Sequence, residues 1–241
     1  QMIPLVFVHG FLGGSAQWAL QLDEIGADHE VIALDLPGFG KNNALPAINS
    51  IGGFAQWIIA ELRAQGVQRY NLIGHSMGGM IAQEIARLDQ QHIEKLVLYG
   101  TGPVGVMPGR FETIAQSKTR ALRDCPSKTA RHIAATWFLA KEKAEQFEAT
   151  ARVAECATPA AIEAGLDAME AWNGVDFLPQ ITTETLVLWG DKDRAYMWAQ
   201  PHKLWSSIPD ANLAVVPGCS HAVHAEKPAF FNALILDFLK N

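Results

Sequence analysis

The hydrophobic pattern of the chain is a series of short, nearly continuous apolar runs with turn residues at their ends. The runs occupy residues 5–8, 31–34, 70–73, 96–99, 186–189 and 213–216. Apolar runs that do not alternate with polar positions are typical of strands that are buried on both faces. They predict six strands of a parallel sheet that helices cover on both sides.

Several segments between these runs have the spacing of amphipathic helices. Residues 51–65 place Phe54, Ile58 and Leu62 on one helical face and end at Gly66, and residues 77–88 and 228–239 are further predicted helices. Because strands and helices alternate, the predicted fold class is α/β, with a mostly parallel central sheet flanked by helices. Such sheets bind their ligands at the carboxyl ends of the strands.

One interval of the chain breaks this alternation. No strand run occurs from residue 103 to residue 179, where helices are predicted at 110–123, 128–140, 143–154 and 160–172. The interval begins at the carboxyl end of the strand at 96–99, which is where a ligand would bind. We therefore expect a core of residues 1–102 and 180–241 and an inserted helical lid of residues 103–179. Extra helices packed on one face of the sheet are the alternative.

The candidate nucleophile is Ser76, which lies in the sequence Gly-His-Ser-Met-Gly-Gly at residues 74–79. This is a G-x-S-x-G motif between a predicted strand and a predicted helix. A strand that turns sharply into a helix holds the serine in a strained backbone conformation with its hydroxyl exposed, and the glycines avoid collisions with neighbouring backbone. A chance serine at the start of a helix is the alternative.

At this point the chain resembles the α/β-hydrolase superfamily, in particular its compact, lidded bacterial serine hydrolases. The resemblance covers nearly the whole chain. It depends on the order and spacing of motifs at residues 8–11, 34–40, 74–79, 188–193 and 220–228. It implies the α/β-hydrolase fold, with the sheet shortened at the N-terminus to about six strands.

A serine hydroxyl needs a base and an acid to become a nucleophile near neutral pH. His221 follows the strand at 213–216 and matches the family's catalytic histidine, with His224 as its rival. Asp191 and Asp193 follow the strand at 186–189, and the resemblance assigns the acid to Asp193, while Asp191 could cap the turn. The order Ser76, Asp193, His221 is the one expected for this fold.

The oxyanion of an acyl-transfer reaction needs two preorganised N–H donors. Met77, at the start of the helix after the serine, supplies one backbone N–H, and the resemblance assigns the other to Phe11. A plain glycine turn with Phe11 in the core is the alternative. We expect His75 to form a wall or to pack, and His9 to hydrogen-bond its own loop.

Composition narrows the classes of partner. The chain has 241 residues, 49% of them hydrophobic, and 19 basic against 25 acidic residues give a net charge of −6. This charge argues against nucleic acid or an anionic membrane as the main partner, and no apolar run reaches the ~18 residues of a membrane helix. The opening residues carry no basic region, so we expect no secretory signal. Cys125, Cys156 and Cys219 form no disulfide or metal pattern, which favours the cytoplasm.

Two further patterns predict no cofactor. Residues 100–105 fit G-x-G-x-x-G, but Pro103 removes an N–H that a phosphate would need and no strand with a terminal acid follows. No histidine–carboxylate cluster has the spacing of a metal site. We therefore expect neither cofactor nor metal. The sequence leaves the oligomeric state open, with a monomer or a weak dimer as the expectation.

The expected reaction is hydrolysis of a carboxylic ester or lactone of a small, largely apolar substrate, through an acyl-enzyme on Ser76. The charges of the predicted lid are mixed in sign and give no case for an anionic substrate. Some of the lid's large apolar side chains should face the site: Met107, Phe111, Trp137, Phe138, Phe147, Met169 and Trp172.

Other reactions of the same triad remain open. Carbon–carbon bond hydrolases and perhydrolases use it, and so does the menaquinone-pathway succinyl-hydroxycyclohexadiene-carboxylate synthase, a lyase. The spacing of His221, His224, Glu226 and Pro228 is similar to that lyase family. The family's Tyr before the serine and Arg after the double glycine are, however, His and Met here. From another class of function, a weakly catalytic ligand sensor is the alternative.

Overall fold

The computed structural model describes residues 2–240 and contains one parallel sheet. Its strands are β1 (Leu5–Val8), β2 (Val31–Leu34), β3 (Tyr70–His75), β4 (Ile93–Tyr99), β5 (Thr185–Gly190) and β6 (Ala211–Val216). They lie in the order β2-β1-β3-β4-β5-β6, and every neighbouring pair is parallel. The predicted α/β class and the six predicted strands are confirmed.

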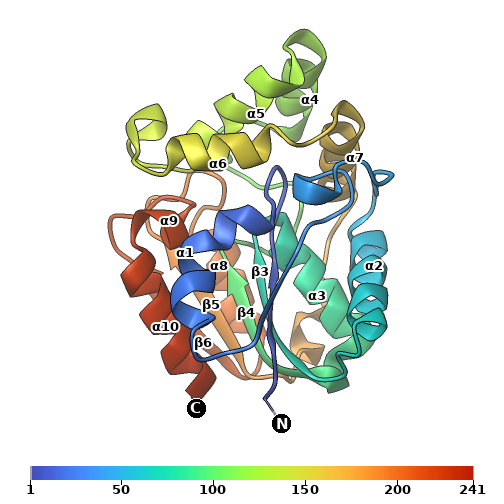
Figure 1. The fold of residues 1–241 in the computed structure, drawn as a ribbon, viewed down its shortest axis with the longest axis vertical. Coiled ribbons are helices and arrows are strands. Elements are labelled where there is room, and N and C mark those ends of the chain that lie inside the picture. The colour runs from blue at the N-terminus through green and yellow to red at the C-terminus, as the bar shows by residue number, and fades with distance from the viewer. Residues whose placement is uncertain (1, 241) are drawn as a thin grey trace.

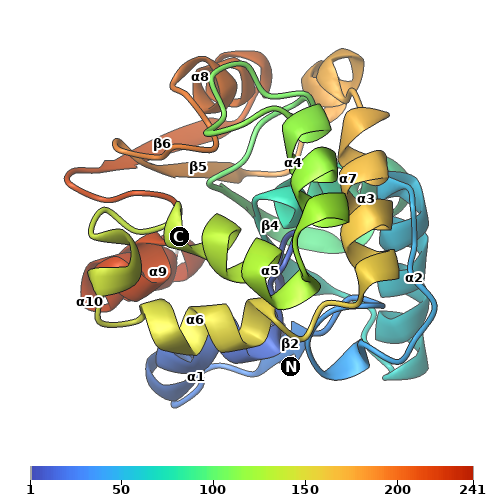
Figure 2. The same cartoon turned by 90° about the horizontal axis from the view of Figure 1, so that it is seen from above.

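Helices cover both faces of the sheet, as Figures 1 and 2 show. On one face α2 (Ile51–Ala64) and α3 (Met77–Asp89) pack near β1, in the apolar cluster that contains Val6 and Val8, and α8 (Ala199–Ser207) packs on β5 and β6. On the other face α1 (Ala19–Ile25) and α10 (Pro228–Lys240) pack on Leu5 and Phe7. Because successive strand side chains point to opposite faces, a strand covered on both sides needs an unbroken apolar run.

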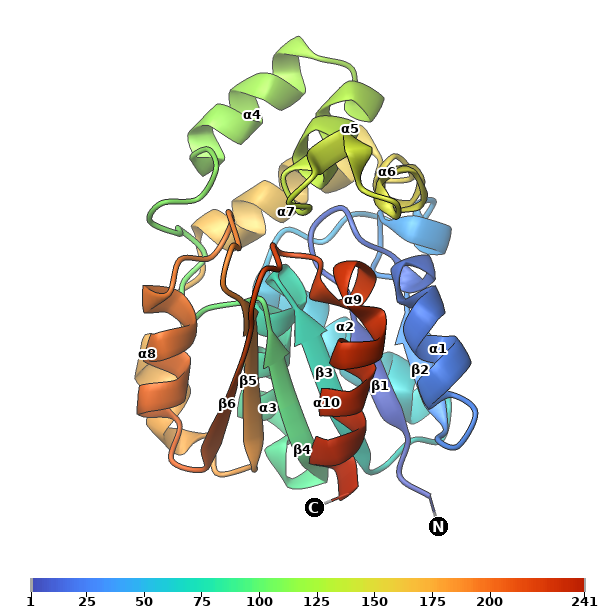
Figure 3. The same cartoon turned by 90° about the vertical axis from the view of Figure 1, so that its left-hand side faces the viewer.

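Four helices lie between β4 and β5: α4 (Ile114–Arg123), α5 (Pro126–Ala135), α6 (Phe147–Ala154) and α7 (Pro159–Glu170). Short 3-10 turns at Lys141–Lys143 and Val175–Gln180 separate or follow them. Figures 1 and 3 show this segment above the carboxyl ends of the strands. That residues 103–179 act as a lid stays a prediction.

All four helices of this segment differ from their predicted bounds: α6 begins at Phe147 rather than at residue 143, and α7 is Pro159–Glu170 rather than 160–172. Helix α4 begins at Ile114 and not at residue 110, because Thr113 and Gln116 bond each other's backbone in a capping box that starts the helix there. Arg110 therefore lies in a loop. Helix α5 ends at Ala135 rather than at residue 140, so Trp137 also lies outside a helix.

The remaining elements are short. They are α9 (Val223–Glu226) and the 3-10 turns Ser15–Trp18, Gly40–Asn42 and Gln90–His92. Within residues 2–240 no helix has the combined length and apolar character needed to cross a bilayer.

Phe54 is a direct test of the packing between α2 and the sheet, because its side chain is fully buried in the core. We expect Phe54→Ala to lower the free energy of unfolding by about 3–5 kcal/mol through lost burial and the cavity that remains. Urea denaturation measures the change. The exposed Gln56 on the same helix is the matched control, and Gln56→Ala should stay within about 0.5 kcal/mol. Equal effects of the two substitutions would contradict the packing described here.

Candidate active site

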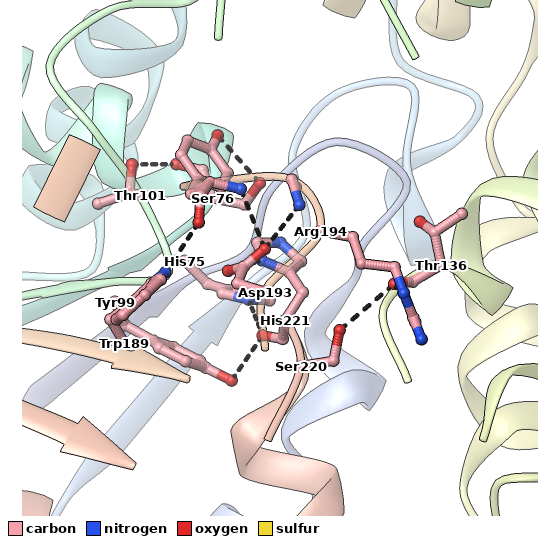
Figure 4. Close-up of polar contacts among 12 residues, drawn as sticks. His75, Ser76, Tyr99, Thr101, Thr136, Trp189, Asp193, Arg194, Ser220 and His221 are labelled. Atoms are coloured by element: carbon pink, nitrogen blue, oxygen red, sulfur yellow. Dashed lines mark hydrogen bonds and ion pairs between the residues drawn. The ribbon is translucent and has the colours of Figure 1, made fainter. Parts of the chain in front are cut away.

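Ser76 forms the whole connection between β3 and α3. Its backbone has φ 61° and ψ −123°, a conformation that costs a residue with a side chain about 1–3 kcal/mol. Two hydrogen bonds hold it: the Ser76 N–H donates to the Tyr99 carbonyl at 3.0 Å, and the Thr101 hydroxyl donates to the Ser76 carbonyl at 2.7 Å. The serine hydroxyl is therefore presented at the carboxyl edge of the sheet, between β3 and β4 (Figure 4).

The glycines around this turn allow neighbouring backbones to meet. A Cβ atom at Gly78 would lie 2.3 Å from the carbonyl oxygen of Val8, and one at Gly74 would lie 2.2 Å from that of Gly78. A Cβ atom at Gly10 would lie 2.7 Å from the His75 carbonyl oxygen and 2.9 Å from the Ser76 Cβ. The loop after β1 is thus packed directly against the turn at Ser76. A larger residue at Gly10 or Gly78 would push the two apart.

His221 and Asp193 are joined by a hydrogen bond of 2.8 Å between Nδ1 and Oδ2 (Figure 4). The other carboxylate oxygen of Asp193 accepts the backbone N–H groups of Ala195 at 2.7 Å and Tyr196 at 3.0 Å. The Asp193 side chain is fully buried. An acceptor on Nδ1 places the proton there, so the free Nε2 of His221 can act as a base toward Ser76, which lines the same clefts.

His224 and Asp191, the alternatives for the base and the acid, form other contacts. His224 is buried, and its Nδ1 lies 2.8 Å from the Tyr99 hydroxyl. Burial, reinforced by the nearby His221, lowers the pKa of His224 from 6.5 to about 3. Asp191 accepts the Gly218 N–H at 2.8 Å across the adjoining turn. The geometry brings together Asp193 and His221, and it gives His224 and Asp191 structural contacts.

Phe11 and Met77 contribute backbone N–H groups at the same place. No residue from 2 to 240 accepts a hydrogen bond from either group. Met77 is the first residue of α3, where backbone N–H groups lack a partner within the helix and the helix dipole favours negative charge. Because Gly10 abuts the serine turn, the two free donors lie at adjoining turns beside the Ser76 side chain.

His75 packs its ring between two others. Its centroid lies 4.4 Å from that of His221 and 4.2 Å from that of Tyr99. The Gln17 side-chain amide lies 3.2 Å from Nδ1, and Nε2 lies 3.1 Å from the His221 carbonyl oxygen. Burial, together with the charge of the neighbouring histidines, lowers the pKa of His75 well below its usual range. The ring thus stays neutral and supports the His221 backbone and ring.

His9 bonds its own surroundings. Its Nε2 accepts the Leu36 N–H at 2.9 Å, and its Nδ1 lies 2.8 Å from the Gly10 carbonyl oxygen. Burial lowers the pKa of His9 from 6.5 to about 4. The ring therefore ties the loop after β1 to the end of β2.

Tyr196 is a residue of the site that the sequence analysis missed. Its hydroxyl lies 3.3 Å from the Ser76 Oγ, and its ring is nearly parallel to that of His221 at 5.6 Å. Burial raises the pKa of Tyr196 above its usual value, so the phenol is neutral near pH 7. The available signal was its position in the loop after β5, three residues beyond Asp193.

Two narrow clefts meet at Ser76, and the space that they leave for a water-sized molecule is about 20 Å³ and 10 Å³. Both are lined by Phe11, Ser76, Trp137 and His221. The first also has a wall from the segment between β4 and β5, formed by Met107, Arg110, Phe111, Ile133 and Met169. The second is lined on its other sides by Gly10, Gln17, His75, Thr150 and His224.

Of the seven large apolar side chains expected from the lid, four line the first cleft: Met107, Phe111, Trp137 and Met169. Phe138 and Phe147 instead pack edge to face with each other at 6.5 Å. Trp172 donates its Nε1–H to Glu84 on α3. The helical pattern could not separate these cases, because buried and cleft-facing positions have the same spacing.

Residues 3–228 match the family model described as alpha/beta hydrolase fold. The chain belongs to the α/β-hydrolase family. Across residues 2–240 of this family member no group of three His, Cys, Asp or Glu side chains could hold a metal ion. Cys125 and Cys156 are exposed free cysteines, and Cys219 is a buried one.

Similar proteins of this family cover almost the whole chain. A relative from Pseudomonas savastanoi pv. phaseolicola, named as a candidate carbamate hydrolase, RutD, is 27% identical and covers 98% of this chain and 93% of its own length. The 2-hydroxy-6-oxo-6-phenylhexa-2,4-dienoate hydrolase of Burkholderia cepacia is 28% identical, covering 98% and 87%. The solved structure of Est816, described as an N-acyl homoserine lactone degrading enzyme, has a TM-score of 0.83 at 26% identity, covering 99% and 93%.

Asp193 and Asp191 allow a matched test of the carboxylate's role. We expect Asp193→Asn to slow labelling of Ser76 by a fluorophosphonate about a thousandfold or more, because His221 loses its charged acceptor and its tautomer. Asp191→Asn, which removes the same charge from the same loop, should change the rate by no more than about twofold. The labelling rate is measured by mass spectrometry of the intact protein. Equal labelling rates for the two variants would contradict a role of Asp193 in activating Ser76.

His224 predicts a pH dependence of stability. The pKa of a histidine in an unfolded chain is near 6.5, whereas the pKa of folded His224 is about 3. Between pH 6.5 and 3, the unfolded chain therefore binds a proton at this position that the folded protein does not. The free energy of unfolding should therefore fall as the pH drops from about 6.5 toward 3. In His224→Gln its slope against pH should be shallower by up to about 1.4 kcal/mol per pH unit. Urea denaturation between pH 6.5 and 4 measures the slope.

The control for this measurement is His132→Gln, a change at an exposed position on α5. It should leave the slope of the unfolding free energy unaltered. A slope in His224→Gln equal to that of the unmodified protein would show that His224 binds its proton equally in both states.

Proposed function

We propose that the protein is a serine hydrolase that cleaves a carboxylic ester or lactone of a small, largely apolar substrate. The observation that carries this proposal is the 2.8 Å hydrogen bond from His221 to the buried carboxylate of Asp193. His221 lines the first cleft together with Ser76, whose backbone φ is 61°. A base with a fixed tautomer and a hydroxyl held at a strained turn are the parts that nucleophilic attack requires.

The residues divide the reaction into two steps. The Ser76 Oγ attacks the carbonyl carbon while its proton passes to the His221 Nε2, and Asp193 stabilises the imidazolium. The backbone N–H groups of Phe11 and Met77 bind the oxyanion. When the intermediate collapses, the carbon–oxygen bond to the alcohol breaks and the alcohol takes the proton from His221. A water molecule then attacks the acyl-enzyme with His221 again as base, which releases the acid and restores Ser76.

The segment of residues 103–179 is proposed to act as a lid. Its side chains Met107, Phe111, Trp137 and Met169 make the wall of the first cleft largely apolar, which suits an apolar acyl or alcohol group. They also limit the access of water to the oxyanion, which strengthens hydrogen bonds from the two N–H donors.

Hydrolysis of a carbon–carbon bond is the second candidate. It is favoured by the 28% identity over 98% of the chain to a hydrolase named for 2-hydroxy-6-oxo-6-phenylhexa-2,4-dienoate. The relative named for carbamate hydrolysis and the lactone-degrading Est816 instead support attack on a carbonyl that carries a heteroatom leaving group. Ester and lactone cleavage needs no group beyond those described here, so we place it first.

Ser76→Ala tests the proposal. The unmodified protein should react with a fluorophosphonate and turn over short-chain p-nitrophenyl esters, and Ser76→Ala should lose both because the nucleophile is gone. We expect turnover of these esters to fall by about a thousandfold or more in the variant. The measurements are intact mass, which also reveals the acyl-enzyme, and release of p-nitrophenol.

A substrate panel separates the alternatives. Rapid cleavage of a dienoate carbon–carbon substrate with poor turnover of esters and lactones would replace ester hydrolysis with the second candidate. Labelling of Ser76 without turnover of any substrate in the panel would favour a ligand sensor and contradict the enzyme proposal.

A further inference from the structure

The cleft between Ser76 and the segment of residues 103–179 contains one permanently charged side chain, that of Arg110. This partly buried residue lies in the loop between β4 and α4 and lines the first cleft together with Tyr196 and His221. No acidic residue among 2–240 lines either cleft, since the Asp193 side chain is buried beneath His221. The positive charge is therefore placed on one side of the nucleophile only.

The guanidinium of Arg110 is oriented but only partly bonded. Its NH1 group donates to the Glu112 carbonyl at 2.9 Å and to the Ser117 hydroxyl at 2.9 Å. The group also stacks over the Phe111 ring, 4.2 Å from its centroid. A guanidinium has five N–H donors, and none of the other three, on Nε and NH2, bonds an acceptor within residues 2–240. Three donors are thus held in a fixed plane without a partner.

No carboxylate of residues 2–240 forms a direct ion pair with Arg110, and Glu112 acts on its charge only from a distance. The acid nearby in sequence, Glu112, is bound by Arg120, whose NH2 lies 2.9 Å from it, and by the Ser117 hydroxyl at 2.8 Å. Burial lowers the pKa of Arg110, but an arginine remains charged in proteins. A partly desolvated cation without a direct ion pair is unfavourable, and an anion bound in the cleft would relieve this cost.

Several other charged side chains of the same segment form ion pairs with one another. Arg131 bonds Glu148 and Glu155, and Lys118 bonds Asp167 and Glu170. Much of the mixed charge of this segment, which gave no case for an anionic substrate, therefore belongs to such pairs outside the clefts. Arg110 differs from these residues because it forms no direct ion pair with an acid of residues 2–240 and because it lines the first cleft.

We propose that Arg110 binds a carboxylate of the substrate in the first cleft. The inference rests on the proposed function and narrows it: the substrate is an ester or lactone that carries a carboxylate close to the reacting carbonyl. The Nε–H and an NH2 hydrogen form the fork that matches the two oxygens of a carboxylate. The second cleft, lined by uncharged groups such as Gln17 and Thr150, receives the uncharged part of the substrate.

Matched pairs of esters test this assignment. p-Nitrophenyl hemiglutarate carries the carboxylate on the acyl side and is compared with neutral p-nitrophenyl valerate. 4-Acetoxybenzoate carries it on the alcohol side and is compared with 4-acetoxytoluene. Each pair is assayed with the unmodified protein, Arg110→Gln and Arg110→Lys. Arg123→Gln is the control, because it removes the same charge from an exposed position of the same segment.

In Arg110→Gln we expect kcat/KM for at least one anionic ester to fall about tenfold to a hundredfold, mainly through a higher KM. The neutral ester of the same pair should change by no more than about twofold, which shows that the variant is folded and its Ser76 is intact. Arg110→Lys should recover part of the loss, and Arg123→Gln should behave as the unmodified protein. Equal losses on the anionic and neutral esters, or no loss on either anionic ester, would overturn the proposal.

Binding without turnover separates this inference from the proposed function. Calorimetry should show that Ser76→Ala binds monomethyl glutarate with higher affinity than dimethyl glutarate. This difference in affinity should vanish in Ser76→Ala/Arg110→Gln. If this preference is present while no ester is cleaved by the unmodified protein, ester hydrolysis is wrong and the carboxylate site stands. If esters are cleaved and the preference is absent, the carboxylate site is wrong and the hydrolase proposal stands.

Discussion

The geometry of the site depends on the single residue that joins β3 to α3. Ser76 has a positive φ, which its side chain disfavours, and hydrogen bonds from the end of β4 and the beginning of the next loop hold it there. Gly10 and Gly78 let the loop after β1 reach this turn without a clash. The position of the Ser76 hydroxyl therefore depends on β1, β3 and β4. The same contacts place the free N–H groups of Phe11 and Met77 beside it.

The segment between β4 and β5 is joined to the loops that carry the acid and the base. Arg194, next to Asp193, donates to the carbonyl of Phe138 at 2.6 Å and to that of Thr136 at 3.2 Å. Glu226 accepts the N–H groups of Ser220 at 2.7 Å and Leu139 at 2.9 Å. The Ala222 N–H donates to the backbone carbonyl of Trp137, and Trp137 lines both clefts. These bonds anchor the cleft wall to the elements that position Asp193 and His221.

The electrostatic environment separates His221 from the histidines that surround it. His75 and His224 are as buried as His221, but their partners are neutral, and burial lowers their pKa values. His221 alone among the three has a hydrogen-bonded carboxylate. In the proposed mechanism, the Asp193 carboxylate stabilises the imidazolium that forms on His221 during the reaction.

The sequence by itself determined the six strands, the α/β class and the strand–turn–helix at Ser76. These features follow from local rules, because a strand buried on both faces needs a continuous apolar run and a tight turn needs glycine nearby. The motif around Ser76 nominated the nucleophile, and the resemblance to α/β-hydrolases nominated Asp193 and His221. The hydrogen bond between Asp193 and His221 was not accessible from order alone, since Asp191 and His224 satisfied the same pattern.

Tertiary structure decided which other side chains surround the nucleophile. Arg110 was expected on a helix, and the capping of α4 at Thr113 left it in a loop beside the first cleft. Tyr196 and Trp137 reach Ser76 and His221 only because loops distant in sequence are packed together. Helical spacing shows which face of a segment is apolar, but the contacts across a cleft are set by how separate elements pack, and that information is not contained in any one of them.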